Sequence, residues 1–304
     1  MSEPAIDLVN VTRRFGAKSA VDGVSLTVQR GQVYGLIGPN GAGKTTTFSM
    51  MCGYLRPSGG TLRVMGVNPW VDGALKGKLG VLPQDAVLPG GWKVGPLLTY
   101  WARLSGLDRP EQEARGSLEK VGLMEAWGVD THALSHGMAK RAALAQALMG
   151  KPPLVLLDEP TAGLDPRIAN QVRQVIRELR DQHTTVVVSS HNLQELEQLC
   201  DAAAILDRGR LAQAGTMAEL TSQTAEFRVQ VASGTVIIPE LHALPGVTSA
   251  RMEGETLLHV RFDGQNHKPE EVISRVVGHL LQTGVLILGV SRGHRLEERV
   301  LQLT

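Results

Sequence analysis

Short runs of apolar residues alternate with stretches of helical spacing through most of the chain. Residues 33–37, 154–157 and 185–190 are rich in Val, Leu and Ile. Strands of a buried parallel sheet have this continuous apolar character. We therefore predict an α/β domain in which the loops at the carboxyl ends of the strands carry the chemistry. Residues 6–11 and 21–28 instead alternate apolar and polar side chains, which predicts an antiparallel flap with one face in solvent.

The pattern restarts after a helical stretch at residues 217–222. A strand at 227–231 is followed by the segment 241–247 and by a hairpin-like pair at 249–252 and 256–262. A helix at 268–282 and a strand at 285–290 complete the series. We therefore expect a first domain of residues 1–222 and a small α+β domain of residues 226–304.

Composition mainly excludes functions. The chain of 304 residues carries 31 Lys and Arg against 30 Asp and Glu, a formal net charge of +1. No basic footprint for nucleic acid is visible in this balance. Cys52 and Cys200 are the two cysteines, without a C-x-x-C pair, which favours a reducing compartment over a disulfide framework or a zinc site. Because no apolar run suits a signal peptide or a membrane span, we expect any membrane role to require a partner.

The chemistry of the chain begins with a phosphate-binding loop of the form G-x-x-x-x-G-K-[ST]. The loop consists of Gly38, Pro39, Asn40, Gly41, Ala42, Gly43, Lys44 and Thr45. It follows a predicted strand and precedes a helix-compatible run that begins at Thr46, which is the context this motif requires. Backbone N–H groups and the helix N-terminus would hold phosphate oxygens, while Lys44 would reach the outer phosphates and Thr45 would ligate Mg²⁺. The sequence thus predicts a nucleoside triphosphate site.

Two carboxylates, Asp158 and Glu159, end the apolar run at 154–157. In phosphoryl-transfer sites such a pair can hold Mg²⁺ through water and activate the attacking water molecule. A second glycine- and lysine-containing segment at 73–78 has the wrong spacing, and Leu79 stands where the hydroxyl would be. We therefore expect one nucleotide site in the chain.

At these residues the chain resembles the ATP-binding subunit of ABC-type transporters. Further motifs of that family follow in the same order over residues 5–220. The family's LSGGQ signature corresponds to Leu134, Ser135, His136, Gly137 and Met138. Gln84 takes the Q-loop position, Asp165 the D-loop position, His191 the switch position, and Phe15 the place of an aromatic residue that stacks on adenine. Residues 97–107 resemble the helical lobe that docks on a permease.

The resemblance implies a set of roles. ATP and Mg²⁺ would be the ligands, with Thr45, Gln84 and Asp158 as the metal set, the last through water. Glu159 would be the general base, and His191 would orient water. The signature, on a helix that Ser135 caps, would meet the γ-phosphate held by a second subunit, so we expect a homodimer or a dimer with a related ATPase subunit. The partner would be an integral membrane permease, with the chain peripheral at the cytoplasmic face of the inner membrane.

The direction of transport rests on two weaker features. His136 and Met138 depart from LSGGQ, and the variant resembles that of drug, polysaccharide and gliding-type exporters. The ending at 296–304 is similar to one common in exporter ATPases, although Arg299 interrupts it. The alternative is a soluble ABC ATPase of translation or DNA repair, which would carry two phosphate loops or a long coiled-coil insertion. Neither feature is present in the sequence, which disfavours this alternative. From the signature and the ending we therefore expect a role in export.

Overall fold

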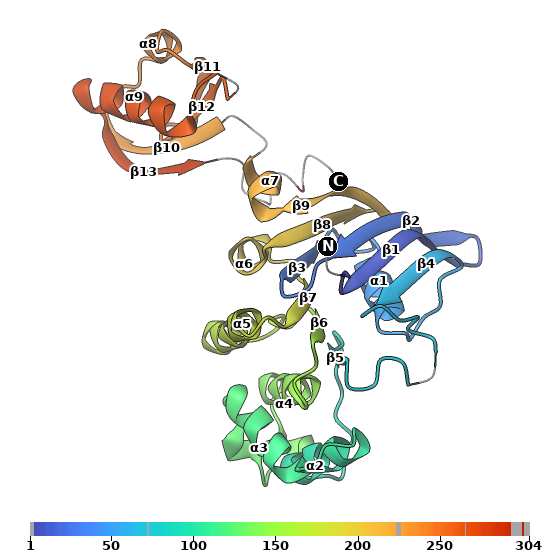
Figure 1. Ribbon diagram of the computed structural model, residues 1–304. Helices are drawn as coiled ribbons and strands as arrows, with labels where there is room; N and C mark the ends of the chain where they lie inside the picture. The colour runs from blue at the N-terminus through green and yellow to red at the C-terminus, as the bar shows by residue number, and fades with distance from the viewer. Residues whose placement is uncertain (1–2, 72, 223–225, 265, 293–299, 301–304) are drawn as a thin grey trace. The chain divides into compact units, whose positions relative to one another are not determined.

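The computed structural model describes residues 3–71, 73–222, 226–264, 266–292 and 300. The chain divides into two compact units, one ending at Met217 and the next beginning at Ala218. The boundary expected at residue 222 lies slightly later, after the helix α7 (Met217–Ser222), whose bounds agree with the predicted stretch. Each unit has a hydrophobic core of its own, and Figure 1 labels the elements of both.

A mixed sheet of six strands forms the centre of the first unit, in the order β5-β6-β7-β3-β8-β9. The strands β5, β6, β7, β3 and β8 are parallel to one another, and β9 is antiparallel to β8. Every residue of β3, β6 and β7 is buried, which is why their sequences are continuously apolar. The strands are β3 (Val33–Ile37), β5 (Leu79–Leu82), β6 (Leu154–Asp158), β7 (Thr185–Ser189), β8 (Ala202–Asp207) and β9 (Arg210–Thr216).

The predicted antiparallel flap is confirmed as a second sheet of three strands. Its order is β2-β1-β4, with β1 (Ile6–Phe15) in the centre, β2 (Lys18–Val28) and β4 (Gly59–Val64). Both edge strands run antiparallel to β1. One face packs with the helix α1 (Lys44–Met51) and the central sheet around a core that includes Ile6, Leu36 and Met50. This core holds the beginning of α1 beside the ends of the central strands.

Helices lie beside the central sheet (Figure 1), and α5 buries one apolar face. In α5 (Pro166–Asp181) the buried residues Val172, Ile176 and Leu179 recur at helical spacing. The helices α2 (Val94–Leu104), α3 (Pro110–Lys120) and α4 (His136–Leu148) pack on one another and form the predicted helical lobe. A short helix, α6 (Leu193–Leu199), follows β7.

The second unit contains a four-stranded antiparallel sheet in the order β11-β12-β10-β13, and the helices α8 and α9 contact this sheet. Its core includes Phe227 from the sheet and Val272 and Val276 from α9. The predicted hairpin, helix and flanking strands are confirmed, while segment 241–247 joins the end of α8 to β11. The elements are β10 (Glu226–Ser233), α8 (Ile238–His242), β11 (Val247–Glu253), β12 (Leu257–Phe262), α9 (Pro269–Gln282) and β13 (Leu286–Arg292).

Two further expectations concern the chain's ending and the absence of a membrane span. Apart from Val300, the ending at 296–304 lies outside the described residues. Within the described ranges, no helix has the length and apolar character that crossing a bilayer requires.

Candidate active site

The phosphate-binding loop connects the buried strand β3 to α1, as its sequence predicts. Gly38 and Gly43 have φ angles of 154° and 100°, which residues with a Cβ rarely adopt. A Cβ on Gly38 would lie 2.3 Å from the carbonyl oxygen of Leu206, and one on Gly43 would lie 2.6 Å from that of Ala20. The glycines therefore allow the loop to turn tightly against two neighbouring strands and begin α1 directly at Lys44.

Lys44 is buried at the start of α1, and its Nζ lies against its own loop. It donates hydrogen bonds to the carbonyl oxygens of Gly38 at 2.6 Å and Pro39 at 3.1 Å. Burial lowers the pKa of this amine, while the carboxylates of Glu159 and Asp158 act in the opposite direction. The two acidic residues thus favour the charged form that a phosphate clamp needs.

Asp158 closes β6 and is buried beside the loop. Its Oδ1 accepts a short hydrogen bond from the Ser189 hydroxyl, at the end of the neighbouring β7, and its carboxylate is also bonded by Thr45. Burial raises the pKa of Asp158 and Glu159 adds to that effect, whereas the two hydroxyls and Lys44 lower it. The carboxylate is therefore held between Thr45, in the first turn of α1, and Ser189, at the end of β7.

Glu159 follows immediately, in the left-handed backbone region with a φ of 51°. Its amide N–H donates to the Ser189 hydroxyl at 3.0 Å and to the Ser189 carbonyl oxygen at 3.2 Å. Its Oε2 lies 2.8 Å from Nδ1 of His191, whose side chain is 69% exposed. A carboxylate and an imidazole in contact, one buried and one facing solvent, can together hold and move a proton.

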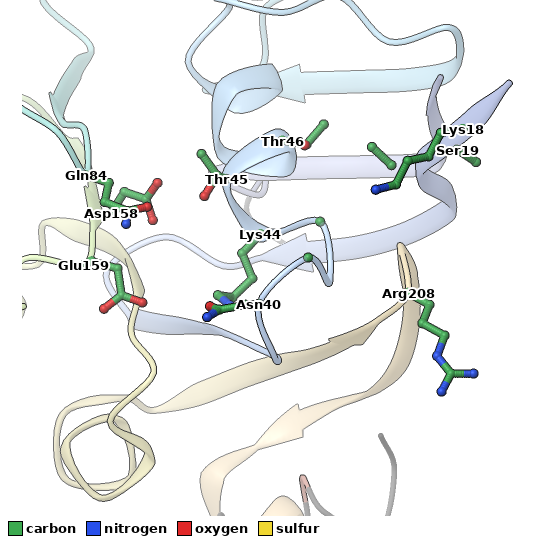
Figure 2. Close-up of a pocket in the computed structure, with 13 residues that line it drawn as sticks. Lys18, Ser19, Asn40, Lys44, Thr45, Thr46, Gln84, Asp158, Glu159 and Arg208 are labelled. Atoms are coloured by element: carbon green, nitrogen blue, oxygen red, sulfur yellow. The ribbon is translucent and has the colours of Figure 1, made fainter. Parts of the chain in front are cut away.

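A cavity of about 430 Å³ brings Lys44, Thr45, Asp158 and Glu159 together, and His191 is not among the described residues that line it. Figure 2 shows Gln84, Asp158 and Glu159 on one side of Lys44 and Thr45, with Lys18, Ser19 and Arg208 on the other. The described residues that line the cavity are Lys18, Ser19, Ala20, Asn40, Gly41, Gly43, Lys44, Thr45, Thr46, Gln84, Asp158, Glu159 and Arg208. The predicted loop, Q-loop and acidic pair therefore meet at one place.

Oxygen donors in this cavity suit a hard divalent cation. The hydroxyl of Thr45 and the carboxylate of Asp158 are in contact, and the Gln84 amide shares the cavity. Mg²⁺ prefers few protein oxygens and keeps water and substrate phosphates as its other ligands. Groups of three or more His, Cys, Asp and Glu that could hold a metal by themselves are absent from the described part of the chain. The donor set fits a cation that is bound together with a nucleotide.

Several predicted residues lie elsewhere. The signature residues Leu134, Ser135, His136, Gly137 and Met138 are not among the described residues that line the cavity. Ser135 is the N-cap of α4, with its hydroxyl accepting from the Met138 amide at 3.3 Å, as predicted. Ser135 and His136 are exposed, so this helix end is open to solvent.

Asp165 and Phe15 likewise stand apart from the cavity. Asp165 is the N-cap of α5, and its Oδ1 accepts hydrogen bonds from the amides of Arg167 and Ile168, both at 3.0 Å. Phe15, at the end of β1, is half exposed, and the guanidinium carbon of Arg13 lies 4.6 Å from its ring centroid.

Sequence reasoning missed other residues of the site. Ser189 bonds both acidic residues, and Lys140 of α4 donates to the carbonyl oxygen of Glu159 at 2.5 Å. Arg208 and Lys18 add positive charge to the cavity wall. For Ser189 a signal was present, because parallel strands end at the same edge, so a hydroxyl at the end of β7 lies near the acids at the end of β6. The contact of Lys140 depends on how α4 packs, which no local pattern encodes.

Comparisons with known proteins agree with this geometry. The ABC transporter family model matches residues 21–162. The linearmycin resistance ATP-binding protein LnrL of Bacillus subtilis (strain 168) is 36% identical over 217 residues, 70% of each chain. The daunorubicin/doxorubicin resistance ATP-binding protein DrrA of Streptomyces peucetius is 35% identical over 309 residues, 99% of this chain and 92% of that one.

A solved structure of an ATP-binding subunit of an ABC transporter superposes on the chain with a TM-score of 0.66 at 27% identity. The match covers 71% of this chain and 91% of the solved one. Translation and DNA-repair ATPases, the alternative that the sequence left open, are not favoured by these relatives. The phosphate loop, the acidic pair and this similarity over most of the relatives' length lead to one conclusion: the chain belongs to the ABC transporter family and is an ATP-hydrolysing subunit of it.

Proposed function

We propose that this chain pairs with a second ATPase subunit, hydrolyses ATP with Mg²⁺ at their shared sites, and so drives export through a separate membrane permease. The observation that carries the proposal is the meeting of Lys44, Thr45, Asp158 and Glu159 in one cavity. Cation, hydroxyl, metal-type carboxylate and candidate base are the parts that phosphoryl transfer to water needs.

Mg²⁺ would supply neutralisation of the charge on the β- and γ-phosphates. Thr45 would hold it directly, Asp158 through water, and Gln84 through its amide oxygen. Lys44 would exchange its bonds to Gly38 and Pro39 for bonds to phosphate oxygens. The loop amides and the N-terminus of α1 would receive the remaining negative charge.

Glu159 is the proposed general base. Its carboxylate is nearly buried beside Lys44 and contacts His191 at 2.8 Å. A water molecule in line with the γ-phosphate would give its proton to Glu159 as it attacks. His191, exposed on the far side of this contact, would orient the carboxylate and donate to the γ-phosphate.

A second subunit completes the proposed site. Ser135 and His136 are exposed at the N-terminus of α4 and lie outside the cavity of their own chain. Such a helix end offers free amides to an anion. In a head-to-tail pair, the signature of each chain would cover the phosphates bound to the other. The pair can be two copies or a copy with a related ATPase subunit.

The permease is proposed from the family and from the names of relatives. LnrL and DrrA are named for drug resistance, which supports an exporter as partner. The helical lobe, with Trp92 and Tyr100 stacked at 5.4 Å and partly exposed, offers it an aromatic surface. We place the chain peripherally at the cytoplasmic face of the inner membrane, where ATP is available, and without a nucleic-acid partner.

Replacement of Glu159 by Gln tests the catalytic part. An amide keeps the size of the side chain but accepts no proton, so we expect ATP binding to persist while turnover falls by about 10²- to 10⁴-fold. Wild-type turnover in Glu159→Gln would move the base elsewhere, with His191 as the next candidate. Trapping of an ATP-dependent dimer of this variant, seen by gel filtration, would support the shared site.

Purification from native membranes tests the partner. The tagged chain, extracted in mild detergent, should carry with it a multi-helix integral membrane protein. Vesicles that contain both proteins should export drug-like, lipid or polysaccharide cargo only with ATP. Recovery of ribosomes or repair proteins without a membrane partner would overturn the transport proposal in favour of the soluble alternative.

A further inference from the structure

Lys140 is a buried cation with no place in the reaction described above. It lies one turn into α4, the helix that begins at the signature, and only 6% of it is exposed. Burying an amine away from water is costly unless strong partners replace the lost hydration. Burial lowers the pKa of Lys140, and the carboxylates of Glu159, Asp158 and Asp85 counter that effect. Burial of this amine therefore lowers the stability of the fold unless its contacts compensate, and the contacts that it makes indicate a role beyond packing.

The partners of Lys140 are two main-chain oxygens of the acidic turn. Its Nζ donates to the carbonyl oxygen of Glu159 at 2.5 Å and to that of Ala162 at 3.1 Å. One amine thus bridges the first and fourth residues of the short segment that follows β6 and leads to the cap of α5. Because an ammonium donor strengthens such bonds, this bridge is a firm tie between α4 and the turn.

The turn itself needs support. Glu159 has a φ of 51°, a backbone conformation that residues with a Cβ leave unless their surroundings hold them. On its amide side, the Ser189 hydroxyl and carbonyl oxygen hold the peptide at 3.0 and 3.2 Å. On its carbonyl side, Lys140 holds the next peptide. The two peptides that flank the Glu159 Cα are both anchored, and they set the direction in which its carboxylate points.

We propose that Lys140 is a positioning residue for ATP hydrolysis, which holds the Glu159 turn so that the carboxylate meets the attacking water. The inference rests on the proposed role of Glu159 as the general base. Misplacement of a catalytic group by about 1 Å can cost about 100-fold in rate. Loss of the tie is therefore expected to lower kcat while leaving the phosphate loop, and with it ATP binding, intact.

Arg141, the next residue of α4, provides a matched control. It is also buried and also binds main-chain oxygens, those of Gly122 at 2.5 Å and Val121 at 3.4 Å. These belong to the helical lobe and not to the acidic turn. Lys140→Met and Arg141→Met each remove one buried cation from the same helix. A loss of stability caused only by removing a buried cation should therefore appear in both variants.

Steady-state kinetics at fixed Mg²⁺ then separate the two roles. We expect Lys140→Met to lower kcat by about 10- to 100-fold with a KM for ATP within about twofold of wild type. Lys140→Arg, which keeps the charge and the donors, should recover most of the lost rate. Arg141→Met should lower the unfolding midpoint but keep kcat per folded protein. Wild-type kcat in Lys140→Met, or equal losses of kcat in both Met variants, would overturn the proposal.

Two further variants keep the test decisive. If Lys140→Met does not fold, Lys140→Gln retains an uncharged N–H donor group on a shorter side chain, and an intermediate kcat is expected. Wild-type kcat in Lys140→Gln would count against the proposed role of Lys140. Combining Lys140→Met with Glu159→Gln should give no further loss beyond Glu159→Gln alone, because the positioned base is already gone. If Glu159→Gln itself keeps its turnover, the general-base assignment fails. A slow Glu159→Gln with an unaffected Lys140→Met disproves only the role of Lys140.

Discussion

Single residues of the site lie in surroundings that disfavour their charged forms. Lys44 and Asp158 are both buried, and burial lowers the pKa of the first and raises that of the second. Each is thereby pushed toward its neutral form, and each is returned toward its charged form by the other. Charge in this cavity is maintained by the group of residues and not by any one of them, as is common where a site must receive a highly charged ligand.

The loop lysine should govern affinity. Lys44→Ala leaves the outer phosphates without their cation, and charge-assisted hydrogen bonds of about 1.5–3 kcal/mol each are lost. We expect the Kd for ATP, measured by calorimetry at fixed Mg²⁺, to rise at least tenfold. Lys78→Ala, in the segment whose spacing excludes a second phosphate loop, serves as the control and should bind as wild type does. Unchanged affinity in Lys44→Ala would contradict the phosphate-loop assignment.

The stability of the folded protein should depend on pH through the Asp158 carboxyl. Because burial raises the pKa of Asp158 in the folded protein, the folded state favours the protonated carboxyl. The stability associated with that proton is present below the unfolded pKa of about 3.9 and is lost as the pH rises through the folded value. Asp158→Asn, which carries no charge, is therefore expected to unfold at a higher temperature than wild type at pH 7.

Thermal midpoints measured between pH 7 and about pH 4 check this expectation. The advantage of Asp158→Asn should shrink as the pH falls, with a midpoint shift of roughly 2–4 °C for each 1 kcal/mol. Its Mg²⁺-dependent hydrolysis should be strongly reduced. Asp108→Asn, at an exposed position, should change neither. A lower midpoint for Asp158→Asn at pH 7 would mean that the hydrogen bonds from Ser189 and Thr45 outweigh desolvation.

Sequence reasoning reached the residues that are close together in the chain. Lys44 and Thr45 could be predicted because loop, strand and helix adjoin, and Asp158 and Glu159 because they end an apolar strand. Lys140 could not, since its contact arises from the packing of α4 and joins residues 19 positions apart. Ser189 lies 30 positions from Glu159 and was missed, although the shared edge of parallel strands gave a signal for it. The left-handed backbone of Glu159 was also invisible, because no glycine marks it.

At the scale of elements, two helices begin at side chains that the family resemblance treats as ligand contacts. Ser135 caps α4 and Asp165 caps α5. A cap and a ligand contact use the same oxygen atoms and the same helix end, so the sequence alone could not separate them. The strand β4 and the helix α3 were missed for a different reason, because their short or charged stretches carry weak periodicity.

Asp165 allows the two roles to be separated. Asp165→Ala removes the acceptor of two amide bonds and should destabilise the protein by about 1 kcal/mol in urea unfolding. Asp165→Asn keeps the cap and loses only the charge, so its stability should match wild type. Turnover per folded protein should then match wild type in Asp165→Asn if capping is the whole role. A slow but stable Asp165→Asn would show that the carboxylate itself acts at the nucleotide.

At the scale of the whole molecule, the chain has two units with separate cores. The core around Ile6, Leu36 and Met50 and the core around Phe227 and Val260 share none of their described residues. The antiparallel pairing of β11 with β12 was readable from the sequence, because residues 249–252 and 256–262 form a hairpin-like pair. The strand order β11-β12-β10-β13 was not readable, since pairing between β10 and β13 joins segments far apart in the chain.

Separate cores should give separate responses to nucleotide and to mutation. Phe227 is fully buried, with its ring centroid 6.1 Å from that of Phe262, and Phe227→Ala should cost about 3–5 kcal/mol. In scanning calorimetry we expect two transitions. A non-hydrolysable ATP analogue with Mg²⁺, at about 100 times its Kd, should stabilise one transition by about 2.7 kcal/mol. Phe227→Ala should lower only the other.

Kinetics complete this test of two units. Because the active-site residues lie in the first unit, Phe227→Ala should hydrolyse ATP at the wild-type rate below the temperature of its lowered transition. Val187→Ala, a fully buried position in β7 of the first unit, is the opposite control and should lower the transition that the nucleotide raises. A single transition that responds to both the nucleotide and Phe227→Ala would instead mean that the units fold as one cooperative body.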